Sequence, residues 1–201
     1  MPTSDHRVLR ADERYRTARA GIQSWHCFSI GDHYDPDNVS FAGLVGVDEH
    51  RIAPGHGFDW HPHRGVTIVS WILAGALRHE QDGHPARTLQ PGEVLVQVTG
   101  AGIRHRETNA SAEPLRLLQT TITSDERHRV TEVHAPPVDV VGGRFIVVRA
   151  DVETNAPRWH AWVVSGRWQV DADELGPGDS MRGCGLLRAT GGGELVLWAQ
   201  S

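Results

Sequence analysis

Residues 55–109 read GHGFDWHPHRGVTIVSWILAGALRHEQDGHPARTLQPGEVLVQVTGAGIRHRETN. This stretch carries two short clusters, His61-Pro62-His63 near its start and His105-Arg106-Glu107 near its end. In each cluster the two candidate ligands stand at positions i and i+2. Because successive side chains of a β-strand point to opposite faces, this spacing places both on one face. The pattern predicts strand pairs that bring three imidazoles and one carboxylate to a common point, as in a metal site.

Short strand-like segments continue on both sides of this stretch. In the first half they cover residues 24–30, 41–48, 66–77, 87–89, 94–99 and 115–122. Residues 123–143 are polar and rich in Pro and Gly, which indicates a connector, and strands resume at 144–149, 159–164, 168–170 and 194–199. Long helical periodicity is absent. Many short strands separated by turns predict an all-β sandwich or barrel of the jelly-roll type.

An internal similarity suggests two copies of one β unit. Trp162–Ser180 resembles Trp71–Val94, because in both a strand ends at Gly, a second strand follows, and a loop leads to Pro-Gly and an acidic residue. The second copy lacks the histidine ligands. We therefore expect an N-terminal domain at residues 1–123 that holds the metal site, and a shorter, degenerate C-terminal domain at residues 124–201.

Composition and charge exclude several classes of protein. The 201 residues are 39% hydrophobic and 22% charged, as in an ordinary globular chain. All 20 basic residues are Arg, and the net charge of −5 argues against a nucleic-acid partner. Cys27 and Cys184 stand far apart, so free thiols are expected rather than a disulfide framework. With no apolar leader at the N-terminus and no long apolar run, we expect a cytoplasmic protein without a membrane partner.

The candidate ligands do not determine which metal binds. Imidazole and carboxylate ligands together suit Fe(II), Mn, Co, Ni, Cu or Zn. Positions left open on such an ion accept substrate, water or O₂, whereas a four-coordinate zinc site is closed or nearly so. A single His-x-His in a chain with 13 histidines is weak evidence, since an exposed pair can arise by chance. The second cluster, with the same spacing, makes a site the better interpretation.

Both clusters resemble motifs of the cupin superfamily. Gly55, followed after five residues by His61 and His63 and then by a strand to Gly75, resembles the first cupin motif. Pro91-Gly92, with GAGIRH at 100–105, resembles the second. More closely, HPHRGVTIVSWILAGALRHE and VTGAGIRHRETN resemble the pirin family, including bacterial pirin-like proteins with quercetin 2,3-dioxygenase activity. The resemblance covers residues 22–122 well and continues only loosely beyond them.

That resemblance implies a bicupin and a function. His61, His63, His105 and Glu107 match the metal-binding positions, with iron as Fe(II) as the implied metal and other divalent ions as alternatives, and Glu107 is also the candidate catalytic base. The implied reaction opens the ring of a flavonol such as quercetin, or of another small aromatic substrate, with O₂. One position departs from the family pattern: Thr67 stands where a Glu is usual, and a Thr hydroxyl cannot serve as a general base near neutral pH.

Two other functions compete with the enzyme. Pirin-like chains also include regulators, so a non-enzymatic metal- or redox-sensing protein that binds a partner protein is one alternative. A cupin that binds metal only for stability is another, and loss of the metal would then lower its melting temperature without abolishing turnover. Among the remaining residues, His79 could orient a ligand imidazole or form a surface pair with Glu80. Trp71 could line the pocket or belong to the core, and His160 is expected in the core or at an edge.

Overall fold

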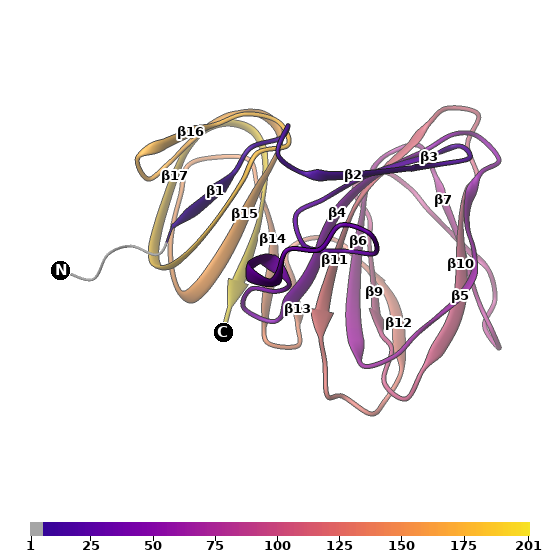
Figure 1. The fold of residues 1–201 in the computed structure, drawn as a ribbon. Coiled ribbons are helices and arrows are strands. Elements are labelled where there is room, and N and C mark those ends of the chain that lie inside the picture. The colour runs from indigo at the N-terminus through magenta and orange to yellow at the C-terminus, as the bar shows by residue number, and fades with distance from the viewer. Residues whose placement is uncertain (1–5) are drawn as a thin grey trace. The chain divides into compact units, whose positions relative to one another are not determined.

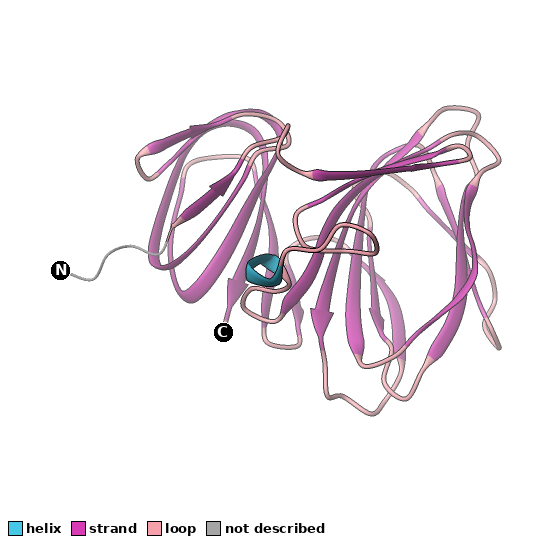
Figure 2. Ribbon diagram, in the orientation of Figure 1, coloured by secondary structure: helices cyan, strands magenta, loops and turns pink. Residues whose placement is uncertain are grey.

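The computed structural model describes residues 6–201, and nearly all of its regular structure is β-strand. One short 3₁₀-helix, η1 (Pro36–Asn38), is the exception among these residues (Figure 2). The all-β prediction is confirmed. Nowhere in residues 6–201 is there a helix with the length and apolarity needed to cross a membrane.

The chain forms two compact units. The first, here called the histidine unit, is Tyr15–Ala135. Its larger sheet has the strand order β12-β9-β6-β11-β4-β3-β2 and its smaller sheet the order β5-β10-β7-β8 (Figure 1). Its strands are β2 (Tyr15–Arg19), β3 (Ile22–His26), β4 (Leu44–Ile52), β5 (Gly57–His63), β6 (Val66–Ala74), β7 (Leu77–Gln81), β8 (Arg87–Leu89), β9 (Val94–Val98), β10 (Ile103–Asn109), β11 (Leu115–Thr123) and β12 (Val130–His134).

The second unit, here called the terminal unit, joins the described residues up to Arg14 with Pro136–Ser201. Its strands are β1 (Arg7–Leu9), β13 (Val138–Val140), β14 (Gly143–Val148), β15 (Val152–Val170), β16 (Asp173–Leu175) and β17 (Ser180–Gln200). The N-terminal strand β1 pairs antiparallel with β17, from Arg7 opposite Arg182 to Leu9 opposite Ser180. Asp179 fixes the segment after β1, because its carboxylate accepts hydrogen bonds from the Ala11 amide (2.8 Å) and the Arg10 guanidinium (3.0 Å).

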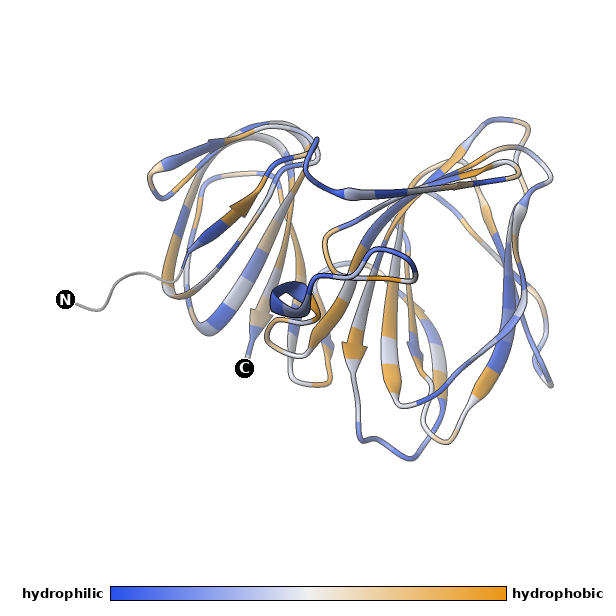
Figure 3. Cartoon of the chain, in the orientation of Figure 1, coloured by the Kyte–Doolittle hydropathy of each residue, from blue (hydrophilic) through white to orange (hydrophobic). Residues whose placement is uncertain are grey.

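Alternating apolar residues give each unit its own core, and Figure 3 shows apolar positions along the strands of both. The buried cluster of the histidine unit comprises Ile22, Ile52, Ile72, Leu77, Leu89, Leu95, Leu115 and Leu117. The cluster of the terminal unit includes Trp159, Ala161, Val163, Trp168, Val170, Leu187, Leu195 and Leu197. His160 is also buried, as expected for a core residue.

The limits of the units differ from the predicted division at residue 123. Strand β12 pairs with β9, so residues 124–135 belong with the histidine unit, while β1 belongs with the terminal unit. The expected connector at 123–143 contains two strands, β12 and β13. β12 is an edge strand, and its residues Glu132 and Val133 are exposed. Its polar residues therefore gave no apolar alternation from which a strand could be predicted.

The expected bent strand at 66–77 is instead two segments. Gly75 adopts φ +76° between β6 and β7, and a side chain there would meet the Cα of Leu115 at 2.8 Å. Such a conformation favours Gly, so the chain turns at this point and β7 joins the smaller sheet. This turn carries the chain from the large sheet to the sheet that bears the histidines.

Candidate functional site

Three of the four predicted ligands meet on the smaller sheet of the histidine unit. His61 and His63 lie on β5 and His105 lies on β10, directly opposite His61 in the antiparallel register. One ring nitrogen from each of the three histidines lies within 4.8 Å of the others. The Nε2 atoms of His61 and His105 are 3.0 Å apart. Two imidazole nitrogens bound at right angles to one ion would lie about 3 Å apart, given a metal–nitrogen bond of about 2.1 Å, so these residues fit a divalent metal.

A β-bulge in β5 determines which side chains of that strand share a face with His61. His105 is paired with His61, but Glu107 is paired with Phe58, so one extra residue of β5 lies between the two pairs. Bulges redirect side chains and are common beside functional sites. Here the bulge brings Phe58 onto the same face as His61, and both line the cavity described below.

The backbone at the bulge also fixes the hydrogen position on His61. The Nδ1 atom of His61 lies 2.6 Å from the backbone carbonyl oxygen of Asp59. Because a carbonyl oxygen can only accept, Nδ1 must carry the hydrogen and donate it. The lone pair of His61 is therefore on Nε2, the atom that faces His105. Such a backbone contact is a usual way of orienting a metal-binding imidazole.

Behind His105, buried side chains hold the other side of its ring. The Nε2 atom of His79 lies 3.1 Å from His105 Nδ1, and the amide nitrogen of Gln97 lies 3.2 Å from the same atom. His79 is thus buried against a candidate ligand, whereas Glu80 faces outward and pairs with Arg106 and Arg78. Of the two alternatives for His79, the orienting role is the one that its position supports.

Burial keeps the imidazoles of His105 and His63 neutral. It lowers the pKa of His105 to about 2, with further lowering by the neighbouring His61, His63 and His79, and lowers the pKa of His63 to about 4, with a smaller effect of His61. A metal binds the neutral form of imidazole, so at neutral pH no proton has to leave before coordination.

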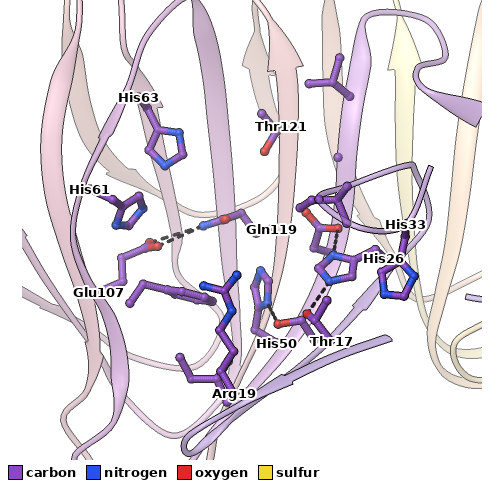
Figure 4. Close-up of a pocket in the computed structure, with 18 of the residues that line it drawn as sticks. Thr17, Arg19, His26, His33, His50, His61, His63, Glu107, Gln119 and Thr121 are labelled. Carbon is purple, nitrogen blue, oxygen red and sulfur yellow. Dashed lines mark hydrogen bonds and ion pairs between the residues drawn. The ribbon is translucent and has the colours of Figure 1, made fainter. Parts of the chain in front are cut away.

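Glu107, the fourth predicted ligand, lies on the same face of β10 as His105 but outside the group of three nitrogens. Its side chain is buried, and the Gln119 amide donates to its two carboxylate oxygens at 3.3 and 3.5 Å (Figure 4). Burial raises the pKa of Glu107, while the Gln119 hydrogen bond and the nearby His61 oppose this rise. The carboxylate therefore faces the cavity beside the histidines and holds a proton more readily than an exposed Glu.

A cavity of about 550 Å³ opens between the two sheets of the histidine unit. His61, His63 and Glu107 line it from the smaller sheet, and Gln119 and Thr121 line it from β11. Its volume lies in the range of pockets that bind small organic ligands, roughly 300 to 1,000 Å³. The cavity can therefore admit a fused-ring aromatic compound next to the histidines.

Sequence reasoning missed the polar residues on the opposite wall. Ser24 and His26 on β3, with Asp48 and His50 on β4, all line the cavity. Each pair stands at i and i+2, the same spacing that marked the ligand clusters. That signal was present in the sequence, but only the pairing of β3 with β4 brings the two pairs together.

Thr67 and Trp71 lie away from the cavity. Ser70 of β6 hydrogen-bonds Gln119 on the cavity side, so residues 67, 69 and 71 face the other side of the sheet. Trp71 is therefore core rather than pocket wall. A Glu at position 67 would point away from this cavity, and the departure at Thr67 does not remove a base from it.

Comparisons with known proteins agree with this architecture. The family described as Pirin matches residues 8–122. A quercetin 2,3-dioxygenase of Escherichia coli is 30% identical over 168 residues, which cover 83% of this chain and 73% of that protein. A putative quercetin 2,3-dioxygenase of Mycobacterium tuberculosis is 40% identical over 124 residues, 61% of this chain. The chain spans about half (51%) of that relative's length.

Solved structures show the same fold. The bacterial pirin YhhW of E. coli, in complex with nickel(II), superimposes with a TM-score of 0.85 at 23% identity, over 97% of this chain and 98% of that one. A quercetin 2,3-dioxygenase from Acinetobacter baumannii gives a TM-score of 0.69 at 16% identity, over 98% and 79% of the two chains. The predicted cupin-type bicupin fold is thereby confirmed.

Proposed function

This chain belongs to the pirin family, and from that premise we propose that it is a metal-dependent dioxygenase. Its substrate would be quercetin or another small aromatic compound, opened with O₂. The observation that carries the proposal is the convergence of three imidazoles, two of which (His61 and His63) line a cavity of about 550 Å³. Relatives named quercetin 2,3-dioxygenase support the same reaction class.

The residues proposed to hold the metal are His61, His63, His105 and Glu107. Iron(II) is the first choice, and Mn, Co, Ni, Cu or Zn would also accept this set of donors. The carbonyl of Asp59 behind His61 and the ring of His79 behind His105 would keep the two imidazoles in place. When bound, a divalent ion would lower the pKa of a substrate hydroxyl group that coordinates to it, and would bring the substrate together with O₂.

The protein's own part is orientation and proton handling. Phe58 would pack against the substrate ring, because its side chain lines the cavity between His50 and His61. The Glu107 carboxylate is proposed to accept the hydroxyl proton of the substrate, and burial favours its protonated form. The Gln119 amide, which donates to both Glu107 oxygens, would hold that carboxylate toward the cavity.

The test is elemental analysis combined with an oxygen-dependent assay. Untagged wild type, the double variant His61→Ala/Glu107→Ala and the control His128→Ala would be compared, since His128 is an exposed histidine outside the cavity. We expect near-stoichiometric metal and quercetin turnover on admitting O₂ in wild type and control, and neither in the double variant. Metal without turnover would favour the metal- or redox-sensing regulator. Metal content equal in wild type and double variant would refute the site.

A further inference from the structure

The wall of the cavity that faces the histidines is built from polar side chains. Thr17 on β2, Ser24 and His26 on β3, and Asp48 and His50 on β4 all line it. In Figure 4, Glu107 and His61 lie together on one side of the cavity and His26 lies on the other side. Gln119 and His50 lie between the two sides. The wall belongs to the larger sheet, whereas the candidate metal ligands belong to the smaller one.

Three of these side chains form a hydrogen-bonded chain with a defined direction. His26 Nδ1 lies 2.8 Å from Asp48 Oδ1, and His26 Nε2 lies 2.9 Å from Thr17 Oγ1. Because a carboxylate accepts, Nδ1 carries a hydrogen, and in the tautomer with a single ring hydrogen Nε2 accepts the hydrogen of the Thr17 hydroxyl. The lone pairs of Thr17 Oγ1 are then left to accept a hydrogen bond from a group in the cavity.

His50 offers a second position on the same wall. Its Nδ1 atom is 2.7 Å from Ser24 Oγ, and its Nε2 atom makes no hydrogen bond within residues 6–201. Burial lowers the pKa of His50 to about 4, although the charge of Asp48 opposes this lowering in part. The ring is therefore neutral at pH 7. A neutral imidazole with one free nitrogen can exchange a hydrogen bond with a hydroxyl group.

So many buried polar side chains are unfavourable in free energy if their only role is to fill a core. Polar groups cost free energy when they leave water, and the cost is recovered only when hydrogen bonds replace those to water. The apolar cluster of the histidine unit shows that this barrel fills its interior with Ile and Leu elsewhere. Thr17 and His50 therefore keep hydrogen-bonding capacity where they line the cavity.

We propose that Thr17, Ser24, His26, Asp48 and His50 form a hydroxyl-binding subsite, which selects aromatic ligands that carry further hydroxyl groups away from the histidine cluster. Thr17 accepts from one ligand hydroxyl, with the His26–Asp48 pair behind it, and His50 bonds a second. The aromatic nature of the ligand rests on the proposed function, but the subsite does not depend on metal or on turnover. A ligand without these hydroxyls would leave the buried His50 ring nitrogen and the half-buried Thr17 oxygen without a partner on the ligand, and such unpaired groups are a strong source of selectivity in pockets.

The probes are quercetin and 3-hydroxyflavone, which keeps the 3-hydroxyl group and lacks the other hydroxyls of quercetin. Binding to the full chain would be measured anaerobically, by quenching of tryptophan fluorescence and by calorimetry. The variants are Thr17→Val and His50→Phe, singly and together, with His56→Ala as control because His56 is exposed and does not line the cavity. Melting temperatures would establish that each variant is folded, and Thr17→Val preserves shape at a half-buried position.

Wild type and control should bind quercetin at least about tenfold more tightly than 3-hydroxyflavone, the value of one good hydrogen bond. Each single variant should lose about threefold or more of this preference, and the double variant nearly all of it. A preference that is unchanged in the double variant would overturn the subsite, as would failure of quercetin to bind wild type below about 1 mM.

The same measurement in His61→Ala/Glu107→Ala separates the two proposals. If that variant keeps the preference while wild type shows neither metal nor turnover, the subsite stands and the dioxygenase falls. If wild type turns quercetin over but the preference for quercetin over 3-hydroxyflavone is unchanged in the Thr17 and His50 variants, the dioxygenase proposal stands and the subsite proposal is refuted.

Discussion

Thr67 carries a buried hydroxyl group that makes no hydrogen bond with any described residue. Its side chain is fully buried on the face of β6 away from the cavity, and within residues 6–201 its Oγ1 atom has no hydrogen-bond partner. An unpaired buried hydroxyl carries a desolvation cost. We therefore predict that Thr67→Val, which keeps the shape, raises the free energy of unfolding by about 1 kcal/mol, measured by urea denaturation.

Thr99 provides the matched control for this prediction. Its hydroxyl donates to the Val66 carbonyl oxygen (2.7 Å) and accepts from the Val66 amide (3.0 Å). Thr99→Val should therefore destabilise the protein by roughly 1 to 3 kcal/mol, because the Val66 amide loses this acceptor and the Val66 carbonyl keeps only its bond from the Thr99 amide. Equal effects of the two substitutions would show that Thr67 has a partner after all.

At the residue scale, the sequence was sufficient for the histidine cluster but not for its surroundings. The i, i+2 spacing within β5 predicted the shared face of His61 and His63 because both belong to one strand. The contact of His79 with His105, and the array around His26, depend on which strands become neighbours. Strand order is decided by the whole sheet, so these contacts have no local signature.

At the scale of elements, the close approach of β5 and β10 sets the geometry of the site. A methyl group on Gly57 would overlap the backbone oxygen of Glu107 and the Cα of Thr108. Gly57→Ala should push the two strands apart, lower the free energy of unfolding by about 1 to 3 kcal/mol, and reduce the metal bound per chain. Thermal unfolding and elemental analysis would measure both effects.

Gly176→Ala is the control, because a methyl group there would have no atom within 4 Å. It should leave melting temperature and metal content unchanged. If Gly57→Ala behaves in the same way, the strands tolerate wider spacing and their close approach at Gly57 does not set the ligand geometry.

The elements themselves were partly predictable. Residues 94–98 and 115–123 form strands within one residue of the predicted limits, because their apolar patterns are bounded by clear turns. The bulge in β5 was not predictable, since one extra residue leaves no mark on composition and is defined only against β10. Strands β15 and β17 are longer than predicted, because they continue through glycines that read as breaks.

At the scale of the whole molecule, buried histidines couple folding to pH. His160 has an ordinary pKa of 6.5, which burial lowers to about 3 in the folded terminal unit, with a further lowering by Arg182. Between these values the unfolded chain binds a proton that the folded chain does not. Its contribution to stability is therefore complete above pH 6.5 and falls as the pH decreases below that value, by about 2 kcal/mol at pH 5.

Urea unfolding at pH 7.5 and pH 5 would measure this dependence in wild type and in His160→Gln. The wild type should lose more stability between the two conditions than the variant, by about 2 kcal/mol. A pH dependence that is identical in both proteins would show that the imidazole of His160 is charged in the folded state or exposed.

The pairing of β1 with β17 has a consequence for how the protein is made. The ribosome synthesises Arg7–Leu9 before Tyr15–Ala135, and the partner strand, Ser180–Gln200, after it. Tyr15–Ala135 is one continuous segment and can acquire its native structure while translation is still under way. The terminal unit has to wait for β17, so during each round of synthesis the nascent strand Arg7–Leu9 remains without its partner until Ser180–Gln200 has been made.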